Sequence, residues 1–305
     1  MANRKSGADV DPEIVATRRE FVVGALAGLA GATLAGSAAP AAPVALAPAR
    51  TDLSLGIQSF TLRRYELEPM LDALVSLGIH QVELIPELEI LYYRLGSHFP
   101  VSDDGAAIDR VVRAVTARGI TISASGVHSI SDAEDAKRLF DFAQRARIPL
   151  LTISPDDDML EALDRLCTEH PKVRLGIHNH GPWTRYDKIS DVEASLAGRA
   201  PNFGACVDTG HFIRSGEDPV EAVRRLGSRV HGLHLKDHAE SGFFASSCLL
   251  GAGKLDLVGL FQVLREIGFG PDRALSLELE RDSDGLLDEI AVCIGNAERA
   301  AAQAS

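Results

Sequence analysis

Aliphatic runs that end in short polar clusters recur along the second half of this 305-residue chain. Four of them close on GIHNH at 176–180, CVDTGH at 206–211, HGLHLKDH at 231–238 and LSLELE at 275–280. Successive side chains of a strand point to opposite faces, so each run can be sorted by the parity of its positions. One face is aliphatic and predicts contact with helices, whereas the other is polar and predicts a site. The polar, inward face carries Gly176, His178, His180, Cys206, Asp208, Gly232, His234, Lys236, Ser276, Glu278 and Glu280.

Strand-like and helix-like stretches alternate eight times between residues 51 and 300. The predicted strands cover 53–58, 80–85, 120–125, 150–154, 173–178, 203–208, 230–236 and 274–279. Each precedes a stretch with apolar residues at helical spacing, as in Leu67, Leu71 and Leu74. This alternation predicts an α/β fold, a single-domain (β/α)8 TIM barrel with its active site at the carboxyl ends of the strands. The long connection at 86–105 predicts either a lid or substrate loop, or a surface excursion with a short helix.

The first 48 residues do not follow this alternation. The pair Arg18–Arg19 precedes an apolar run at 22–34 and an Ala-rich stretch at 36–48. This order is typical of a twin-arginine (Tat) export signal, with cleavage expected near Ala39 or Ala42. A membrane anchor or a disordered tail is the alternative, although a span needs about 20 apolar residues. We therefore expect residues 1–48 to be a signal peptide and linker, the protein to be periplasmic or secreted, and no stable membrane insertion after cleavage.

Charge and cysteine usage narrow the classes of partner. After residue 50 the chain carries 26 basic and 39 acidic side chains, a net charge of −13. A domain this acidic repels nucleic acids and anionic lipids, so no nucleic-acid partner is expected. The cysteines lack CxxC spacing and indicate neither a zinc ribbon nor a disulfide framework. They are Cys167, Cys206, Cys248 and Cys293.

Asp208, His234 and Glu278 are the strongest candidates for chemistry. Two carboxylates and an imidazole from consecutive strands would converge at the mouth of a barrel. Mixed oxygen and nitrogen ligands suit a divalent ion such as Mn²⁺, Mg²⁺, Co²⁺ or Zn²⁺. His178, inward on the fifth strand, is the expected fourth ligand, with His180 two residues later. The alternative for any one of them is an ordinary polar residue at a strand end.

Further polar and aromatic residues are expected to line the pocket. Lys236 extends the seventh strand, where it would polarise a substrate carbonyl or pair with Asp237. Trp183, the only tryptophan, and Phe212 would form an apolar wall against a sugar, with core packing as the alternative for Phe212. The other candidates for substrate binding are Glu83 on the second strand, His128 after the third, and His211 three residues after Asp208.

As a set, these residues resemble the xylose isomerase-like superfamily of sugar phosphate isomerases and epimerases, which also includes inosose dehydratases, tagatose and psicose 3-epimerases and the endonuclease IV branch. The resemblance implies a divalent metal held by strands five to eight, with Asp208, His234 and Glu278 at three of its ligand positions. At the fourth, many relatives have Glu where this chain has His178, which removes one of the two carboxylates that exchange protons in the 3-epimerases. The matching segments are GIQSFTLR at 56–63, GIHQVEL at 78–84, GIHNH at 176–180, DTGH at 208–211, HGLHLKD at 231–237, LGAGKLD at 250–256 and LSLELE at 275–280.

The chemistry that the resemblance implies is proton abstraction next to a carbonyl, through an enediolate. Glu278 is the expected base, with His178, His180 or Lys236 returning the proton. The leading prediction is a metal-dependent sugar or polyol isomerase or epimerase. A keto-sugar dehydratase or 3-keto-glycoside lyase is the alternative, followed by an endonuclease IV-like phosphodiesterase and a non-catalytic sugar-binding protein. A small-molecule sugar or sugar derivative is the expected partner, and a homo-oligomer is compatible with each alternative.

Overall fold

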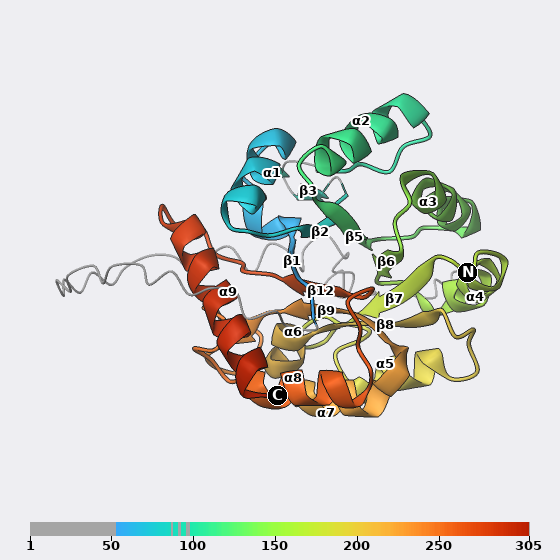
Figure 1. Cartoon of the computed structure of the whole chain (residues 1–305). Coiled ribbons are helices and arrows are strands. Elements are labelled where there is room, and N and C mark those ends of the chain that lie inside the picture. The colour runs from blue at the N-terminus through green and yellow to red at the C-terminus, as the bar shows by residue number, and fades with distance from the viewer. Residues whose placement is uncertain (1–52, 87, 91–92, 96–97, 305) are drawn as a thin grey trace, which may run out of the picture.

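Eight parallel strands close into a barrel in the computed structural model, which describes residues 53–304 apart from 87, 91–92 and 96–97 (Figure 1). Around the barrel the order is β1-β12-β9-β8-β7-β6-β5-β2, and every neighbouring pair is parallel. This confirms the predicted (β/α)8 barrel. The strands are β1 (Leu55–Gln58), β2 (Gln81–Leu84), β5 (Thr121–His128), β6 (Leu150–Ile153), β7 (Arg174–His178), β8 (Phe203–Asp208), β9 (Val230–Leu235) and β12 (Ala274–Leu277).

Helices between successive strands surround the barrel (Figure 1). Several begin at an aspartate whose side chain accepts a hydrogen bond from the first turn, as Asp132 does for α3 and Asp218 for α7. The helices are α1 (Leu67–Ser76), α2 (Gly105–Thr116), α3 (Ala133–Ala146), α4 (Leu160–Glu169), α5 (Ile189–Leu196), α6 (Thr209–Arg214), α7 (Pro219–Leu226), α8 (Leu257–Glu266) and α9 (Leu286–Gln303), with short 3-10 turns η2 (Ser59–Leu62), η3 (Asp157–Met159) and η4 (Gly227–Arg229).

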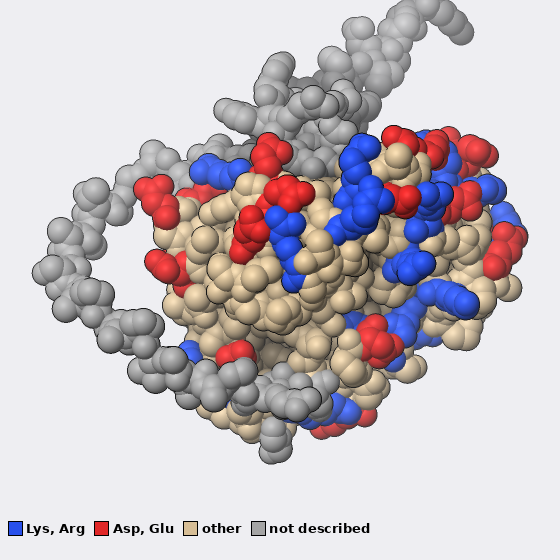
Figure 2. All heavy atoms as spheres, turned by 45° about the horizontal axis from the view of Figure 1, so that its top comes forward, with Lys and Arg blue, Asp and Glu red and all other residues tan. Residues whose placement is uncertain are grey.

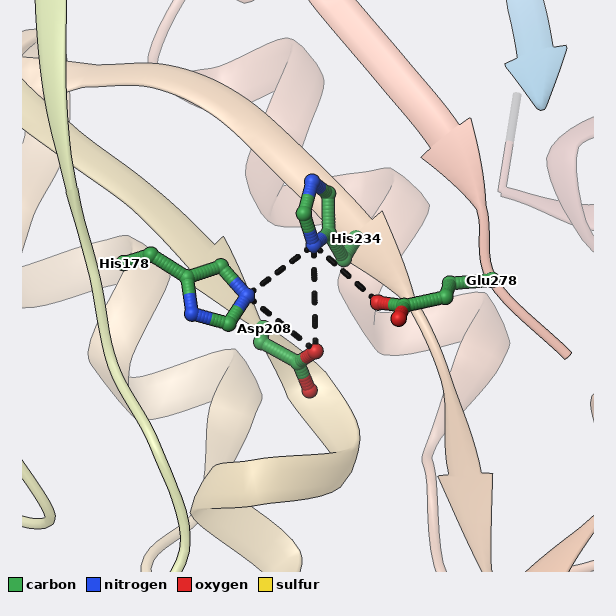
Figure 3. Close-up of side chains that lie close together, drawn as sticks. All are labelled: His178, Asp208, His234 and Glu278. Carbon is green, nitrogen blue, oxygen red and sulfur yellow. Dashed lines mark hydrogen bonds and ion pairs between the residues drawn. The ribbon is translucent and has the colours of Figure 1, made fainter. Parts of the chain in front are cut away.

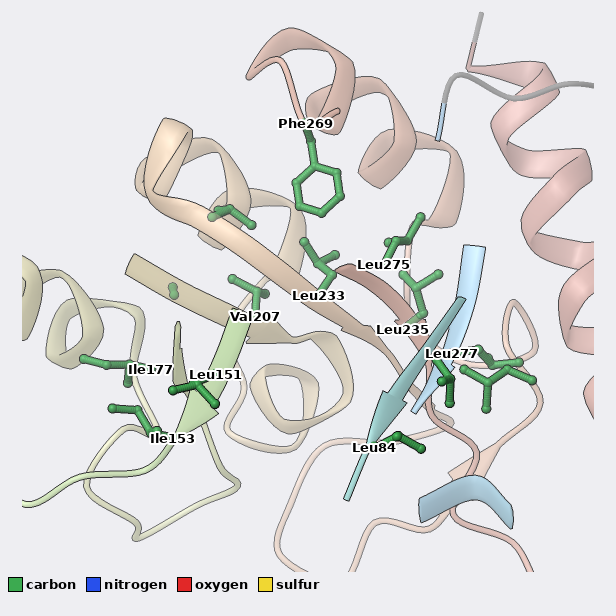
Figure 4. Packing of buried hydrophobic residues seen from close by; sticks show 14 of the residues in the cluster. Leu84, Leu151, Ile153, Ile177, Val207, Leu233, Leu235, Phe269, Leu275 and Leu277 are labelled. Carbon is green, nitrogen blue, oxygen red and sulfur yellow. The ribbon is translucent and has the colours of Figure 1, made fainter. Parts of the chain in front are cut away.

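The aliphatic face of each strand packs outward against these helices (Figure 4). Ile177, Leu233 and Leu235 are completely buried there, as the parity of the sequence predicts. Burying each such side chain stabilises the fold by about 1.5–3 kcal/mol. Inside the barrel a small separate cluster consists of Ala124, Leu150 and Ala274. Because β6 and β12 begin at two of these residues, this cluster fills the amino-terminal end of the barrel and leaves the carboxyl ends to polar groups.

Two short antiparallel ribbons depart from the predicted elements. In the connection at 86–105 the described residues form β3 (Leu88–Ile90) paired with β4 (Tyr93–Leu95), not the short helix that was one alternative. After β9, β10 (Asp237–His238) pairs with β11 (Ser247–Cys248). The Asp237 carboxylate accepts hydrogen bonds from the backbone N–H groups of Gly251, Gly253 and Leu255, at 2.9–3.0 Å. Asp237 therefore anchors the loop before α8 and is not the partner of Lys236.

Charged side chains of both signs are interspersed on the surface, and Figure 2 shows Lys and Arg beside Asp and Glu on one face. Some pairs join neighbouring helices, such as Arg145 to Asp109 at 2.9 Å. Exposed pairs of this kind contribute roughly 0–1 kcal/mol each. Within the described part of the chain, no helix has the length and apolarity needed to cross a bilayer. The export signal predicted for residues 1–48 lies outside the described residues.

Candidate metal centre and active site

The four residues predicted to hold a metal meet at the carboxyl ends of adjacent strands (Figure 3). His178 ends β7, Asp208 ends β8, His234 lies near the end of β9, and Glu278 follows β12. One donor atom from each lies within 4.8 Å of the other three. His234 Nδ1 is 3.0 Å from His178 Nε2 and 3.1 Å from Glu278 Oε2, and Asp208 Oδ2 is 3.5 Å from His178 Nε2. All four side chains are buried.

Hydrogen bonds between strands set the position of Asp208. Its Oδ1 accepts from the His211 backbone N–H at the start of α6, which turns Oδ2 toward the cluster. Asn179 exchanges two hydrogen bonds with the Asp208 backbone, at 2.8 and 2.9 Å. Thr209 Oγ1 donates to the Lys236 carbonyl and accepts from the Lys236 N–H. Sequence reasoning missed Asn179 and Thr209 as positioning residues, although they lie inside the HNH and DTGH motifs.

Glu83 orients His234 from within the barrel. His234 Nε2 donates to Glu83 Oε2 at 2.9 Å, and the same carboxylate accepts from Ser276 Oγ at 3.0 Å and Thr152 Oγ1 at 2.9 Å. With Nε2 directed at Glu83, the other ring nitrogen, Nδ1, faces the cluster. A carboxylate behind a histidine is the usual second partner of a metal-binding imidazole. Glu83, predicted to bind substrate, is completely buried and its described partners are these three protein groups.

The donor set fits a divalent cation. Asp208 Oδ2 and Glu278 Oε2 are buried, and in the described part of the chain they face the Lys236 ammonium and the two imidazoles. Burial alone would lower the pKa of His234. The effects of Cys206, Glu83 and Glu278 outweigh burial, so this pKa lies well above its ordinary value. The cluster therefore favours positive charge at Nδ1, whether a proton or a metal. Two carboxylates and two neutral imidazoles would balance the charge of a divalent ion, and their oxygen and nitrogen donors suit several such ions.

Lys236 supplies a fixed positive charge beside the cluster. Its Nζ lies 3.1 Å from Asp208 Oδ2, 3.0 Å from Glu278 Oε2 and 3.1 Å from Glu280 Oε1. Burial lowers the pKa of Lys236, but these three carboxylates outweigh it and raise the pKa above the usual value. Lys236 therefore remains an ammonium donor at neutral pH and does not act as a base.

The two remaining catalytic candidates, Glu278 and His180, have pKa values shifted in opposite directions. Burial raises the pKa of Glu278, and the positive charges of Lys236 and His234 only partly oppose it. A carboxylate with a raised pKa is a stronger base, as proton abstraction from carbon requires. His180 is half-buried, its ring centre is 4.6 Å from that of His178, and burial lowers its pKa to about 4. His180 is therefore neutral at pH 7.

The predicted substrate-binding residues lie in different surroundings. His211 is buried beside the cluster, with Nε2 3.9 Å from Asp208 Oδ2 and Nδ1 3.3 Å from Arg214 Nη1. His128 is buried at the end of β5, where Nε2 lies 3.1 Å from Ser125 Oγ and burial lowers its pKa to about 4. Trp183 is 73% exposed. Phe212 is completely buried, so core packing, the alternative for this residue, is confirmed.

Comparison with known proteins finds relatives by sequence. The chain is 30% identical over 192 residues to 3-oxo-isoapionate decarboxylase from Pectobacterium atrosepticum, a match that covers 59% of this chain and 62% of the relative. It is 37% identical over 62 residues to inosose dehydratase from Mesomycoplasma hyopneumoniae, covering 20% of this chain and 21% of the relative. The chain thus matches less than two thirds of the length of these curated relatives.

Solved structures share the fold over most of the chain. An uncharacterized protein from Parabacteroides distasonis superposes with a TM-score of 0.62 at 26% identity, covering 80% of this chain and 97% of that protein. The IolI protein, solved with a bound zinc atom, superposes with a TM-score of 0.60 at 16% identity, covering 83% and 98% of the two chains.

The family model for the xylose isomerase-like TIM barrel matches residues 71–304. This range begins inside α1 and extends past the end of α9. It includes every barrel strand except β1, and all four residues of the buried cluster. The chain belongs to the xylose isomerase-like TIM barrel family.

Proposed function

We propose that this protein is a metal-dependent lyase that removes a proton next to the carbonyl of a keto sugar or keto-glycoside and expels a group from the neighbouring carbon. The observation that carries the proposal is the asymmetry of the buried cluster. Both carboxylates, Asp208 and Glu278, contact the Lys236 ammonium, whereas β7 contributes the imidazole of His178. The site therefore offers one strong base and one fixed cation, which suits removal of a proton from one face of the substrate.

Each residue of the site has a distinct task in this reaction. Glu278, whose pKa is raised, accepts the proton from carbon. Lys236 donates a hydrogen bond to the substrate oxygen on which negative charge develops, and it faces no loss of its own proton. Glu83 holds His234 in one tautomer. A divalent cation held by His178, Asp208, His234 and Glu278 would supply further positive charge to the substrate oxygens.

The identity of His178 favours lyase chemistry over a symmetric epimerisation. Epimerisation by two bases needs a second group that gives a proton to the opposite face. Burial lowers the pKa of His178 far below the ordinary value, and its Nε2 faces His234 and Asp208. The proposed elimination needs no second proton on carbon. The decarboxylase and inosose dehydratase named among the relatives are both lyases, and this supports the same class here.

Isomerisation or epimerisation is the second candidate, and the position of His180 favours it. Its half-buried ring lies 4.6 Å from that of His178 and 5.4 Å from that of His211, between centres. A histidine at the edge of the site could return a proton to the carbon from which Glu278 removed one. In D₂O, such a reaction would place deuterium on a carbon of the isomerised sugar.

The two candidates are separated by a single experiment. Metal-loaded protein is incubated in D₂O with free ketoses and with 3-keto-glycosides, and products are followed by NMR and mass spectrometry. We expect an unsaturated keto sugar and a released aglycone, and no turnover after chelation with EDTA. Deuterium in an otherwise intact sugar would instead support the isomerase. Identical rates with and without EDTA would contradict metal dependence.

We also propose that the protein acts in the periplasm or outside the cell. The twin-arginine pattern in residues 1–48 supports this location. Cell fractionation of the full chain tests it, because replacing Arg18 and Arg19 with Lys should retain the protein in the cytoplasm with its signal uncleaved. Equal export of both forms would contradict a twin-arginine route.

A further inference from the structure

Three aromatic residues form an exposed shelf, defined here as Trp183, Phe243 and Phe244. The rings of Trp183 and Phe243 stack with centres 4.9 Å apart and planes 24° apart, and Phe244 meets Phe243 edge-on at 5.1 Å. Trp183 is 73% exposed and Phe244 is 82% exposed. Scattered exposed apolar residues are common, but two rings that both contact Phe243 form with it a surface on which a ligand ring can lie.

The shelf is held by contacts from separate parts of the chain. The backbone of Trp183 has a positive φ of 71°, which residues other than glycine rarely adopt. Its N–H donates to Asp187 Oδ2 at 3.0 Å. Arg214 Nη2 donates to the Phe243 carbonyl at 2.6 Å, and its guanidinium lies 5.9 Å from the centre of the Phe243 ring. The Gly242 N–H donates in turn to the Arg214 carbonyl. A ligand that bound here would meet rings that are already in place, which lowers the entropy cost of binding.

Arg214 also connects the shelf with the buried cluster. Its Nη1 lies 3.3 Å from His211 Nδ1, and His211 Nε2 lies 3.9 Å from Asp208 Oδ2. Trp183, Phe243, Arg214, His211 and Asp208 thus form one continuous series of contacts. Arg214 and His211 therefore connect the shelf with the cluster through α6.

Polar groups without partners lie beside the shelf, at Arg214, and beside Lys236, at His238. His238 is 2% exposed, yet neither of its ring nitrogens has a hydrogen-bond partner among the described residues, and Arg214 Nε also has none. A Cβ added at Gly210 would meet Lys236 Cγ at 2.5 Å and His238 Cδ2 at 2.8 Å, so His238 packs beside the Lys236 stem. Gly210 and Arg214, four residues apart on α6, share a face of that helix. Burying polar groups without partners costs free energy, which a ligand with oxygen atoms would recover.

We propose that these residues form a leaving-group subsite for a keto-glycoside with an apolar or aromatic aglycone. The inference rests on the lyase function proposed above and names its substrate class. The aglycone ring lies on the shelf, and His238 and Arg214 bind the oxygens of the glycosidic link and the adjoining sugar.

The reaction balances without an oxidant or a further co-reactant. With the ketone at C3 of the sugar, Glu278 removes the proton from C2, and the electrons of that C–H bond form a C1–C2 double bond. The bond between C1 and the glycosidic oxygen breaks, and its electron pair leaves with the aglycone oxygen. That oxygen ends with one proton, so the proton lost from carbon is conserved. The products are an unsaturated keto sugar and a free alcohol or phenol.

Kinetics with two aglycones test the subsite. The substrates are the 3-keto-glucosides of phenol and of methanol. The kcat/KM of each is measured for the wild type, for Trp183→Ala and for Phe243→Ala. The control is Val292→Ala, which truncates an exposed side chain on α9. Because phenol is also the better leaving group, the subsite is tested by the change in kcat/KM from wild type to variant on each substrate. In both shelf variants kcat/KM should fall about tenfold for the phenyl substrate, and the fall for the methyl substrate should be several-fold smaller. Val292→Ala should have the same kcat/KM values as the wild type. An equal loss on both substrates would overturn the proposal.

A binding measurement separates failure of the subsite from failure of the proposed reaction. Trp183 is the only tryptophan, so the intrinsic fluorescence of the protein reports on the shelf itself. Unoxidised phenyl β-glucoside should change this emission with saturation, methyl β-glucoside should not, and Phe243→Ala should weaken the phenyl response about tenfold. Saturable phenyl binding without turnover of either keto-glucoside would keep the subsite and reject the reaction. Turnover with no phenyl-specific binding would reject the subsite alone.

Discussion

His234 and His231 lie three residues apart on β9 and face opposite sides of the barrel wall. Both are buried, with 0% and 4% of their surface exposed. The pKa of His234 lies well above its ordinary value, because Cys206, Glu83 and Glu278 outweigh the effect of burial. The pKa of His231 is lowered to about 4 by burial, and the nearby arginines Arg174, Arg273 and Arg229 lower it further.

The difference between these histidines lies in the charge of their neighbours. Inside the barrel, carboxylates gather around His234 and prepare its Nδ1 for a proton or a metal. Outside, guanidinium groups surround His231, whose Nδ1–H donates to the Leu175 carbonyl at 3.2 Å. A buried histidine alone therefore does not indicate a functional site, and its charged partners do.

Among the changes that separate the inner from the outer face, removal of one inner carboxylate should have the largest effect on metal affinity. Asp208→Ala deletes a candidate ligand and leaves the Lys236 ammonium with one partner fewer. Metal affinity should fall by more than the 10–100-fold that is typical for loss of an outer partner. We expect a loss on the order of a thousandfold, about 4 kcal/mol. Elemental analysis and titration calorimetry measure it, with Asp72→Ala, at an exposed ion pair, as the matched control.

Full metal occupancy of Asp208→Ala after dialysis would contradict a ligand role. It would also mean that the surroundings of His234 favour a cation no more than those of His231. Circular dichroism of the variant checks that the barrel remains folded.

Glu278→Gln should reduce turnover strongly with less effect on metal binding. The amide keeps the shape and one oxygen but cannot accept a proton, so kcat should fall by about 10²–10⁴-fold. Glu280→Gln, two residues later, is the matched control, because Glu280 contacts Lys236 but is not one of the four donors. Rates are measured at saturating metal. Activity of Glu278→Gln close to the wild type would remove this residue as the base.

The main features of the fold and of the inner cluster were predictable from local patterns. Alternation by parity placed His178, Asp208 and His234 on one face, and the same alternation placed Ile177 and Leu233 in the outer core. Both follow from the period of two in a strand, which needs no knowledge of distant partners. Strand limits agreed within one or two residues, except that β5 continues to His128.

Contacts that depend on the closed barrel could not be predicted in this way. Glu83 meets His234 and Ser276 across 151 and 193 positions of sequence, and only the register of the strands brings them together. The β3–β4 and β10–β11 ribbons have two or three residues per strand, too few for any periodic signal. No sequence pattern indicated the subsite proposed for Arg214 and His238, because that proposal depends on contacts between α6 and separate loops.

Weakening the carboxylate behind His234 should have an intermediate effect. In Glu83→Gln the amide still fills the buried space, but it offers His234 Nε2–H a neutral acceptor in place of a charged one. Metal affinity should fall 10–100-fold with little change in fold. Ser276→Ala is the matched control, because it removes a donor to the same Glu83 oxygen and leaves His234 in place. Equal affinities for Glu83→Gln and Ser276→Ala would show that Glu83 does not tune His234.

His231 should contribute to the pH dependence of stability in the opposite sense from His234, whose pKa is raised. The unfolded chain binds a proton at His231 below about pH 6.5, whereas the folded protein does so only near pH 4. The contribution of His231 to stability is therefore complete above pH 6.5 and falls by about 1.4 kcal/mol for each pH unit between these values. In His231→Asn, which keeps a donor for the Leu175 carbonyl, this part of the loss should disappear. Urea unfolding of both proteins at pH 6.5, 5.5 and 4.5 in EDTA measures the difference, and parallel curves would mean that His231 titrates alike in the folded and unfolded chains.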